Sequence, residues 1–550
     1  MKAELRTKIQ DTLKTVGYDD PTDFSLEQAP KPEMGDFATN VAMVIAGTEK
    51  KSPRDIAEKI KLELEKYEEI IKVEIAGPGF INITLSPDIY LAELAKIIEQ
   101  KENYGRTKIG QGKKVNVEYI SANPTGPLHV GNARGGPIGE ALANLFDFRG
   151  YSVSREFYVN DIGGQADRFG KSLSYWYEIK SHPDLVFPED GYPGEYIRDI
   201  SEEVQTKNSE TIKRLTTSGE RVAFFRDEGI KKIIEGIKSD VALLNIKFDI
   251  WSYQSKIEES RKSDGIIQSL KNKSATVEKD GALWFKNPGD ENLEDKESVL
   301  IKSDGQLTYF ADDIAYHQDK IDHGFDKLID IWGANHSGHV PRMKGALSAL
   351  GFDDQNMEIV LYQYIRLKQS GQSVKMGKRF GNFVTLREII EAGVSADAFK
   401  YFILSQNLNT PFDFDLELAA DTSEKNPVFY IKYAHARICS ILEKDRGRGT
   451  RDEGRTDYSQ LKNDKELALI KELVKFPEII EEIAANFQIQ ALPHFVYKTA
   501  GIFHDFYSTC RVIDAESKEL EQARLSLILA TKYVLKNSLA ILGIEAPEHM

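Results

Sequence analysis

The chain has 550 residues, of which 41% are hydrophobic and 29% charged, an ordinary globular composition. At roughly 150 residues per domain, this length predicts three to four domains and excludes a protein dominated by disorder. The formal net charge of -15 excludes a protein whose main role is to coat nucleic acid or an anionic membrane, because such binding needs a basic face. This net charge is still compatible with a local basic groove.

The cysteine content and the N-terminus indicate the compartment. Only Cys439 and Cys510 occur, and neither has a partner at metal-ligand spacing, so we expect no disulfide scaffold and no protein-bound zinc. The first twenty residues are charged throughout and lack the apolar core of a signal peptide, and no run approaches about 18 apolar residues. We expect a soluble cytoplasmic protein with no membrane contact.

Residues 1–110 are predicted to form a small α/β domain. An amphipathic helix is expected through Val16, an apolar stretch runs over 37–45, and a charged helix is expected over 53–67. The alternating pattern over 80–85 predicts a strand. A glycine-rich polar stretch over 103–114 is typical of a linker.

Residues 111–420 are predicted to form a parallel-sheet domain. A buried strand over 115–120, a Gly/Pro-rich loop over 121–132 and a helix over 133–148 make the start of a βαβ unit. Strand-like patterns return at Tyr309 and over 327–332, and the charged, irregular stretch from about 171 to 300 is interpreted as an insertion between two halves of the sheet. Residues 421–550 have helical periodicity almost throughout, which predicts an all-α domain.

The loop over 121–132 is the first candidate for chemistry. A helix N-terminus attracts anions, Gly131 would let a ligand approach the backbone, and His129 could donate to a phosphate oxygen. A plain βα turn with a satisfied histidine remains the alternative interpretation.

The loop Lys375-Met-Gly-Lys-Arg-Phe-Gly-Asn382 is the second candidate. Three cations between glycines suit a flexible loop that closes on a triphosphate and neutralises developing charge. Residues 361–400 carry seven Lys or Arg against three Asp or Glu, so this loop lies in a basic island of an acidic chain. The alternative is a solvated turn. The chain has no Walker-type Gly-x-x-x-x-Gly-Lys-Ser/Thr motif, so P-loop chemistry is not supported.

These two motifs, His129-Val-Gly-Asn132 and Lys375-Met-Gly-Lys-Arg379, resemble the HIGH and KMSKS motifs of class I aminoacyl-tRNA synthetases. The longer run Val117-Glu-Tyr-Ile-Ser-Ala-Asn-Pro-Thr-Gly-Pro-Leu-His-Val-Gly-Asn-Ala-Arg134 is similar to the arginyl-tRNA synthetases of bacterial type. The family's second histidine is Asn132 here, and its central serine is Gly377.

The resemblance implies a Rossmann-type catalytic domain, an N-terminal domain that touches the tRNA and a helical anticodon-binding domain. It implies that a monomer activates L-arginine with ATP, assisted by Mg²⁺, and transfers arginine to the 3′ end of tRNA(Arg). No dedicated Mg²⁺ cage is apparent in the sequence, which is normal for a cation carried by nucleotide phosphates.

The resemblance also assigns residues. The catalytic and ATP-binding set is His129, Gly131, Asn132, Lys375, Met376 and Lys378. The arginine-binding set is Glu118, Asn123, Tyr309, Asp313 and His336, which offers carboxylates and an aromatic hydroxyl to a planar guanidinium. The tRNA-binding set is Phe80 and Asn82, then Tyr433, Arg437, Tyr507 and Met550, with Tyr430, Lys432 and His435 expected on the same helix face as Tyr433 and Arg437.

Other interpretations stay open at this point. A class I synthetase for cysteine or glutamate would share the adenylate chemistry, although the chain lacks a zinc set and its predicted pocket is acidic. A non-catalytic tRNA-binding or nucleotide-binding module descended from a synthetase is the second alternative, because Asn132 and Gly377 depart from the family motifs.

Overall fold

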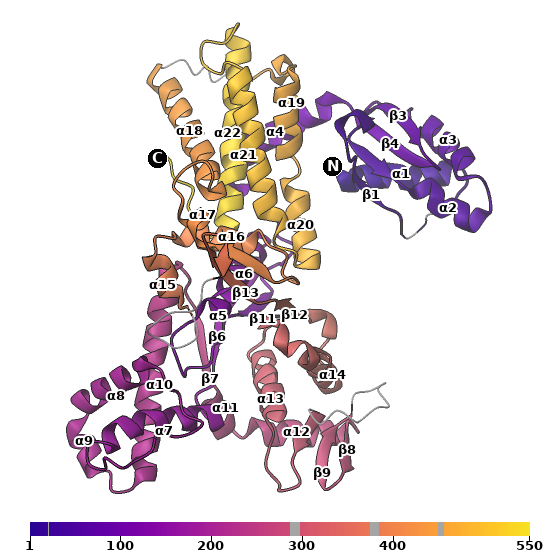
Figure 1. Cartoon of the computed structure of the whole chain (residues 1–550). Helices are drawn as coiled ribbons and strands as arrows, with labels where there is room; N and C mark the ends of the chain where they lie inside the picture. The colour runs from indigo at the N-terminus through magenta and orange to yellow at the C-terminus, as the bar shows by residue number, and fades with distance from the viewer. Residues whose placement is uncertain (20, 22, 287–297, 374–383, 449–455) are drawn as a thin grey trace.

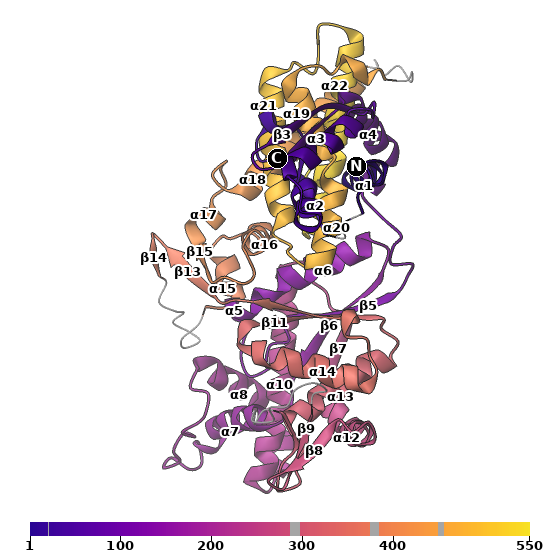
Figure 2. The ribbon, with the colours of Figure 1, turned by 90° about the vertical axis from the view of Figure 1, so that its right-hand side faces the viewer.

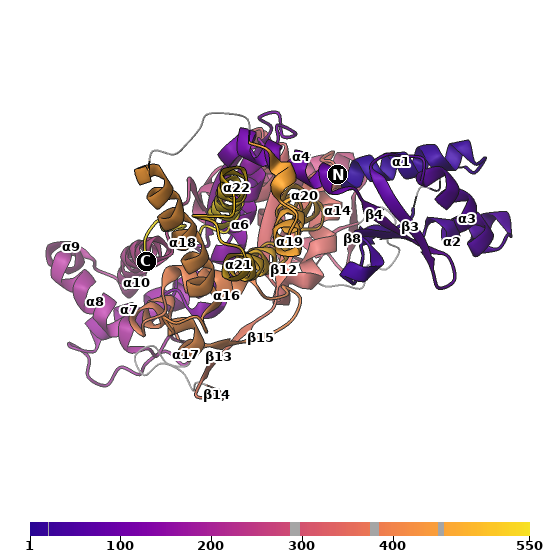
Figure 3. The same ribbon diagram turned by 90° about the horizontal axis from the view of Figure 1, so that it is seen from above.

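The computed structural model describes residues 1–19, 21, 23–286, 298–373, 384–448 and 456–550. Figure 1 shows a helical bundle at one end, a parallel-sheet domain in the middle and a small N-terminal domain that projects to the side of the bundle. Seen from above, the N-terminal domain and helix α9 (Ser209–Arg214) lie at opposite ends of the molecule (Figure 3).

The N-terminal domain packs helices against a four-stranded antiparallel sheet of order β1-β2-β4-β3. Its elements are α1 (Lys2–Thr15), β1 (Leu26–Gln28), β2 (Phe37–Thr39), α2 (Val41–Glu49), α3 (Pro53–Leu64), β3 (Ile70–Ala76), β4 (Phe80–Leu85) and α4 (Pro87–Gln100). The predicted first helix and the strand over 80–85 are confirmed. The apolar stretch over 37–45 divides into β2 and α2, and α4 leads the chain back onto the helical bundle.

The middle domain is built on a five-stranded parallel sheet of order β12-β11-β5-β6-β7. Its strands are β5 (Lys114–Glu118), β6 (Ser152–Val159), β7 (Ile250–Tyr253), β11 (Lys327–Gly333) and β12 (Met357–Tyr362). Helices α5 (Val130–Ala133) and α6 (Gly135–Phe148) connect β5 to β6. The predicted strand, helix and later strand are confirmed at β5, α6 and β11, and they place the ends of β5, β6 and β11 at one edge.

The charged stretch from about 171 to 300 is not irregular, and this part of the prediction is wrong. It contains most of α7 (Gly164–Glu178), all of α8 (Glu195–Lys207), α9, α10 (Ser218–Leu243), α11 (Gln254–Glu259) and α12 (Lys262–Asn272), and strand β7 of the main sheet. A buried stripe on α10, including Phe225, Ile233 and Ile237, is the reason for its helix. The high charge density hid that stripe. Figure 2 shows α7, α8 and α10 at the end of the molecule opposite the bundle.

The second half of the domain carries a small antiparallel sheet of β8 (Thr276–Lys279), β9 (Ala282–Phe285) and β10 (Val299–Ile301). Helix α13 (Tyr309–Asp322) follows, so Tyr309 begins a helix and the strand predicted there is wrong. Phe310 and Ile314, one turn apart, are buried on the same face, and this helical spacing outweighs the aromatic start of the segment. The 3₁₀ helix η4 (Ala334–His339) and α14 (Val340–Leu350) connect β11 to β12.

The chain then crosses to the helical domain. A minor sheet contains β13 (Ile365–Gln369), β14 (Gln372–Ser373) and β15 (Phe412–Asp415). Helices α15 (Leu386–Glu391) and α16 (Ala396–Leu404) come between β14 and β15 in the sequence. After α17 (Leu416–Ala420), the predicted all-α segment is confirmed as α18 (Pro427–Arg448), α19 (Asp464–Leu473), α20 (Phe476–Asn486), α21 (Ala491–Thr509) and α22 (Lys518–Ile541).

Candidate functional site

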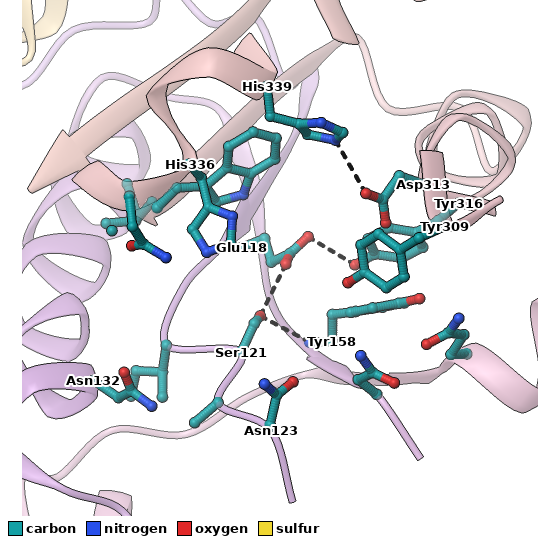
Figure 4. Close-up of a pocket in the computed structure, with 18 of the residues that line it drawn as sticks. Glu118, Ser121, Asn123, Asn132, Tyr158, Tyr309, Asp313, Tyr316, His336 and His339 are labelled. Atoms are coloured by element: carbon teal, nitrogen blue, oxygen red, sulfur yellow. Dashed lines mark hydrogen bonds and ion pairs between the residues drawn. The ribbon is translucent and has the colours of Figure 1, made fainter. Parts of the chain in front are cut away.

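A cavity of about 950 Å³ opens at the carboxyl edge of the main sheet, where β5, β6 and β11 end. Such an edge is the usual ligand site of an open α/β sheet. Figure 4 shows side chains from both halves of the domain directed into this space. The sequence-predicted residues that line it are Glu118, Asn123, His129, Asn132, Tyr309, Asp313 and His336.

The backbone turns sharply directly after β5. Ile120 and Ser121 have φ values of 68° and 40°, so the strand predicted to reach residue 120 ends at Glu118. Positive φ is unfavourable for a β-branched residue, and such strain is concentrated at functional sites. The turn brings the Ser121 hydroxyl 2.9 Å from Glu118 Oε1 and 3.0 Å from the Tyr158 amide nitrogen.

His129 caps the helix that begins at the end of this loop. Its Nδ1 accepts the Asn132 N–H at 3.3 Å, which assigns the ring proton to Nε2. Burial lowers the pKa of His129, so the imidazole is neutral at pH 7. A Cβ on Gly131 would lie 3.1 Å from the His129 ring, so this glycine makes room for the histidine. Gly131 itself is not among the cavity-lining residues.

The chain that follows the second basic loop returns to the first motif. Val130 donates its N–H to Val384 O at 3.0 Å, and Leu386 donates to Leu128 O at 2.9 Å. Lys375, Met376 and Lys378 fall in 374–383, outside the described residues. The described flank at Val384 nevertheless lies hydrogen-bonded beside the segment that carries His129.

Hydrogen bonds and ion pairs orient the two carboxylates, Glu118 and Asp313, at the acidic end of the cavity. Glu118 is 5% exposed, and its Oε2 lies 2.5 Å from Lys320 Nζ and 2.9 Å from the Tyr316 hydroxyl. Asp313 Oδ2 lies 3.1 Å from His339 Nε2. Tyr309 is 54% exposed, but partial desolvation at the cavity wall, together with the carboxylates of Asp313 and Glu118, raises the pKa of its hydroxyl, which keeps its proton.

Burial also lowers the pKa of His336, with His339 acting in the same direction. Asn123 lies on the loop after β5, at the opposite side of the cavity from Asp313 (Figure 4). A neutral His336 and Asn123 are hydrogen-bonding groups without charge. The cavity therefore has an acidic side and a neutral polar side, which suits a ligand with a cationic end.

Several residues that line the cavity are not among the site residues predicted from the sequence. They are Ser121, Tyr158, Asn160, Gln165, Tyr316 and His339. Residues 157–160 resemble 117–123, because an apolar strand segment is followed by a polar residue in both. This pattern could have indicated Tyr158 and Asn160 as candidates. No signal in the sequence places Tyr316, because its partners are far away in the chain.

The helical domain brings three of the four predicted tRNA-contacting residues together. Arg437 lies over the rings of Tyr507 and Tyr433, with centroids 5.1 Å and 5.9 Å from its guanidinium carbon. Tyr433 in turn stacks on His504, and their ring centroids lie 5.9 Å apart. Met550 is 57% exposed at the end of the chain.

The prediction that Lys432 and His435 share one face of α18 with Tyr433 and Arg437 is wrong. Lys432 is paired with Asp397, and His435 is 1% exposed, with Nδ1 2.7 Å from Pro547 O. The reason is that α18 packs on two sides, so these polar groups bind the neighbouring segments and Tyr430 and Tyr433 face α21.

In the N-terminal domain, the two predicted residues differ in exposure. Phe80 is 39% exposed at the start of β4, whereas Asn82 is 8% exposed between β2 and β3. Phe80 is thus available to a partner at the surface, and burial counts against a direct contact by Asn82.

Within the described ranges, no group of three or more His, Cys, Asp or Glu side chains could hold a metal ion. Both cysteines are buried and free. No helix in the described part of the chain is long and apolar enough to cross a membrane.

Comparison with known proteins gives consistent matches along the chain. The arginyl tRNA synthetase N terminal domain matches residues 3–85, the catalytic domain of tRNA synthetases class I (R) matches 93–407, and the DALR anticodon binding domain matches 431–550. The arginine–tRNA ligase of Shouchella clausii is 44% identical over 530 residues, which are 96% of this chain and 94% of the relative.

The arginine–tRNA ligase of Bacillus subtilis is 40% identical over 556 residues, covering 100% of this chain and 99% of the relative. Among solved structures, the arginyl-tRNA synthetase of Thermus thermophilus superposes with a TM-score of 0.79 at 22% identity and covers 100% of both chains. This last likeness establishes a shared fold from end to end.

Proposed function

The chain belongs to the arginyl-tRNA synthetase family and is an arginine–tRNA ligase, and from this premise we propose how its cavity performs the reaction. The reaction uses ATP, L-arginine and tRNA(Arg). An oxygen of the arginine carboxylate attacks the α-phosphorus of ATP, and pyrophosphate leaves. A hydroxyl at the 3′ end of the tRNA then attacks the arginyl carbonyl, and AMP leaves.

The single observation that carries the residue assignment is the meeting of both predicted sets in one cavity. His129, Asn132, Glu118 and Asp313 all line it, and Figure 4 shows Asn132 and Asp313 on opposite sides. These residues are up to 195 positions apart in the chain, between Glu118 and Asp313, and only the fold brings them together. An amino acid whose cationic side chain occupies the acidic side would direct its carboxylate toward the first motif.

We assign the phosphates to the His129 side. Because Nδ1 of His129 accepts the Asn132 N–H, the ring proton lies on Nε2, and we assign this N–H as the donor to a phosphate oxygen. A neutral donor keeps this role across the pH range in which an ordinary histidine titrates, since burial lowers the pKa of His129. Asn132 supplies an amide in place of the family's second histidine. Lys375, Met376 and Lys378, outside the described residues, are assigned to the same phosphates by resemblance alone.

We assign arginine to the acidic side. Asp313 lies at the first turn of α13 and Glu118 at the end of β5, so the two carboxylates approach a ligand from different elements. A planar guanidinium presents five donors in a fixed fork that two separated carboxylates can share, whereas a lysine ammonium is a point charge. Asn123 and His336 would then hold the α-amino end, and the Tyr309 hydroxyl would test the shape of the guanidinium.

Mg²⁺ fits this site as a companion of the nucleotide. The donors on the phosphate side are a neutral histidine and amides, which do not make a cation cage, so phosphate oxygens and water would supply its ligands. When bound with ATP, Mg²⁺ would neutralise phosphate charge.

We also propose that residues 1–110, 111–420 and 421–550 act as the tRNA-contacting, catalytic and anticodon-binding units of a cytoplasmic monomer. Phe80 in the first unit and Tyr433, Arg437, Tyr507 and Met550 in the third are the proposed tRNA contacts. The exposed Phe80 and the cation–π stacking of Arg437 support these contacts.

The substitution Asp313→Ala tests the arginine assignment. Loss of a partly buried carboxylate that binds a charged group costs about 2–5 kcal/mol, so the arginine KM should rise by roughly thirtyfold or more while the ATP KM stays within about twofold. Steady-state charging of tRNA(Arg) at varied arginine and then at varied ATP gives both constants. An unchanged arginine KM would remove Asp313 from the pocket assignment.

A further inference from the structure

Lys320 is a buried lysine directly beneath the acidic side of the cavity. Its side chain is 2% exposed on α13, and Nζ lies 2.5 Å from Glu118 Oε2 and 3.0 Å from Asp330 Oδ1. Asp330, on β11, is fully buried and also lies 2.7 Å from His317 Nε2. Lys320 thus bridges Glu118, which lines the cavity, and Asp330, which does not.

The donors around Glu118 fix how it faces the cavity. An ionised carboxylate has about four lone-pair sites. Lys320 Nζ donates to Oε2, and the Ser121 hydroxyl donates to Oε1. The single proton of the Tyr316 hydroxyl is shared between Glu118 Oε2 at 2.9 Å and Glu156 Oε1 at 2.8 Å. Since Glu118 still lines the cavity, the carboxylate keeps at least one acceptor position for a ligand N–H.

Burial alone would make Glu118 a poor acceptor. Desolvation, reinforced by Asp330 and Glu156, raises the pKa of Glu118 above its usual range. Lys320 is the largest effect in the opposite direction, and His317 adds a smaller one. Burial also disfavours the charge of Lys320, but Asp330 and Glu118 outweigh it and raise the pKa of Lys320. Within the described ranges, Lys320 is the only lysine or arginine in ion-pair contact with Glu118.

The other titratable groups that face Glu118 come from every element packed against it. They are Tyr316 and His317 on α13, Glu156 on β6, Asp330 on β11, and Tyr158 and Tyr309 on the cavity side. Burial lowers and Asp330 raises the pKa of His317, with a net increase, and its ring is bonded to Asp330 and not to Glu118. The tyrosines keep their protons, because burial raises the pKa of Tyr158 and Tyr316. Lys320 is thus the group in direct contact with Glu118 that most strongly favours its charged form.

We propose that Lys320 is a positioning residue for amino acid recognition: its buried ammonium keeps Glu118 ionised and oriented so that Glu118 accepts a guanidinium N–H. This inference rests on the proposed role of Glu118 in arginine binding and deepens it. Lys320 touches no ligand itself. Without Lys320, the buried carboxyl would carry a proton, would lose its attraction for a cation and could donate a hydrogen bond instead.

The test replaces Lys320 by an uncharged side chain of similar length, Lys320→Met, in the full-length protein. Arginine binding is measured by calorimetry from pH 6.5 to 8.5, as the ratio of the variant Kd to the wild-type Kd at each pH. Because arginine must then displace a proton from Glu118, this ratio should exceed about tenfold at pH 6.5 and fall by up to about tenfold per pH unit as the pH rises. The ratio cancels the titration of His336, which both proteins share.

Citrulline provides a second readout of the same charge. It has the shape of arginine, but its neutral urea group carries a carbonyl acceptor. A protonated Glu118 can donate to that carbonyl, so the preference for arginine over citrulline should shrink at least tenfold at pH 6.5 in Lys320→Met. A purely structural ion pair would change neither the pH dependence nor this preference.

Two controls separate the possible failures. Arg524→Met breaks a similarly buried pair with Glu466, 2.7 Å apart in the helical domain, and should lower stability without changing arginine binding or its pH dependence. Glu118→Gln should weaken arginine binding at all pH values. If Glu118→Gln binds arginine as the wild type does, the proposed role of Glu118 fails.

If Glu118→Gln is weakened but the Lys320→Met ratio is flat with pH, the inference about Lys320 is overturned and the role of Glu118 stands. Where Lys320→Met does not fold, the double variant Lys320→Met/Asp330→Asn removes one buried charge of each sign and is measured in its place. A pH-dependent ratio of the same direction but smaller size is expected from it, because Asp330 itself raises the pKa of Glu118, and a flat ratio again overturns the inference.

Discussion

The two ends of the cavity are built in different ways. At the proposed arginine end, Ser121, Tyr316 and Lys320 contact Glu118, and His339 contacts Asp313, so each carboxylate is oriented before any ligand arrives. At the proposed nucleotide end, Nδ1 of His129 accepts a backbone N–H at 3.3 Å, and the ring is neutral. Selection among amino acids needs charges that are already fixed, since unpaired buried carboxylates reject the wrong ligand. Phosphate chemistry needs donors that bind charge as it develops.

The largest expected effect breaks the nucleotide end alone. His129→Ala removes a neutral donor to the phosphates, and loss of one such donor typically costs about 10²–10³ in kcat. Arginine binding by calorimetry should remain within about twofold of wild type. A single-turnover assay of AMP release gives the rate, and an unchanged rate would show that His129 only caps α5.

A second change affects neither end of the cavity. Arg437→Ala removes the guanidinium that lies over Tyr507 and Tyr433, and loss of such a cation–π platform costs about 1–2 kcal/mol at a nucleic-acid interface. The KM for tRNA(Arg) should rise about tenfold while the arginine and ATP constants stay the same. Lys444→Ala is the matched control, because Lys444 is an exposed cation on the same helix. Equal effects of the two substitutions would contradict a specific role for Arg437.

The smallest expected effect concerns the support beneath the arginine end. Burial raises the pKa of Asp330, but Lys320 and His317 outweigh it and hold the pKa at about 2, below the model-compound value of 3.8. A carboxyl with a depressed pKa stabilises the fold above its unfolded-state pKa, and this stabilisation is lost as the pH falls toward 2. Between pH 5 and pH 3, wild type should therefore lose about 1 kcal/mol more unfolding free energy than Asp330→Asn.

Urea unfolding at the two pH values measures this difference, which does not depend on the lower overall stability of the variant. A pH dependence identical in the two proteins would mean that Asp330 is not held ionised by Lys320.

The sequence predicted the framework better than the support of the site. β5, α6 and β11 have clear patterns of burial, and the first motif lies between β5 and α6 as expected. The sequence predicts a strand at Tyr309 because a short aromatic run fits both the helical and the strand period, and only the buried Phe310 and Ile314 one turn apart reveal the helix. The helices of the charged α7–α10 region are not predicted for a similar reason, since the charged residues on their solvated faces dominate the composition.

The ion pairs beneath the cavity could not be predicted from the sequence. Glu118 and Lys320 are 202 positions apart, and their contact depends on how α13 packs beneath the ends of β5 and β11. A lysine within a helix that also carries several aspartates is normally solvated, so nothing in its local sequence indicates burial. Long-range packing, and not local pattern, produces the preorganised half of the site.

The most direct test of the account is charging of tRNA(Arg) by the intact protein with all amino acids, and citrulline, offered in competition in the presence of ATP and Mg²⁺. The ester formed is identified by mass spectrometry after hydrolysis. We predict that arginine accounts for essentially all of the charged product, with lysine and citrulline at background. Charging with lysine or citrulline at a rate comparable with arginine would contradict a cavity whose fixed carboxylates select the guanidinium.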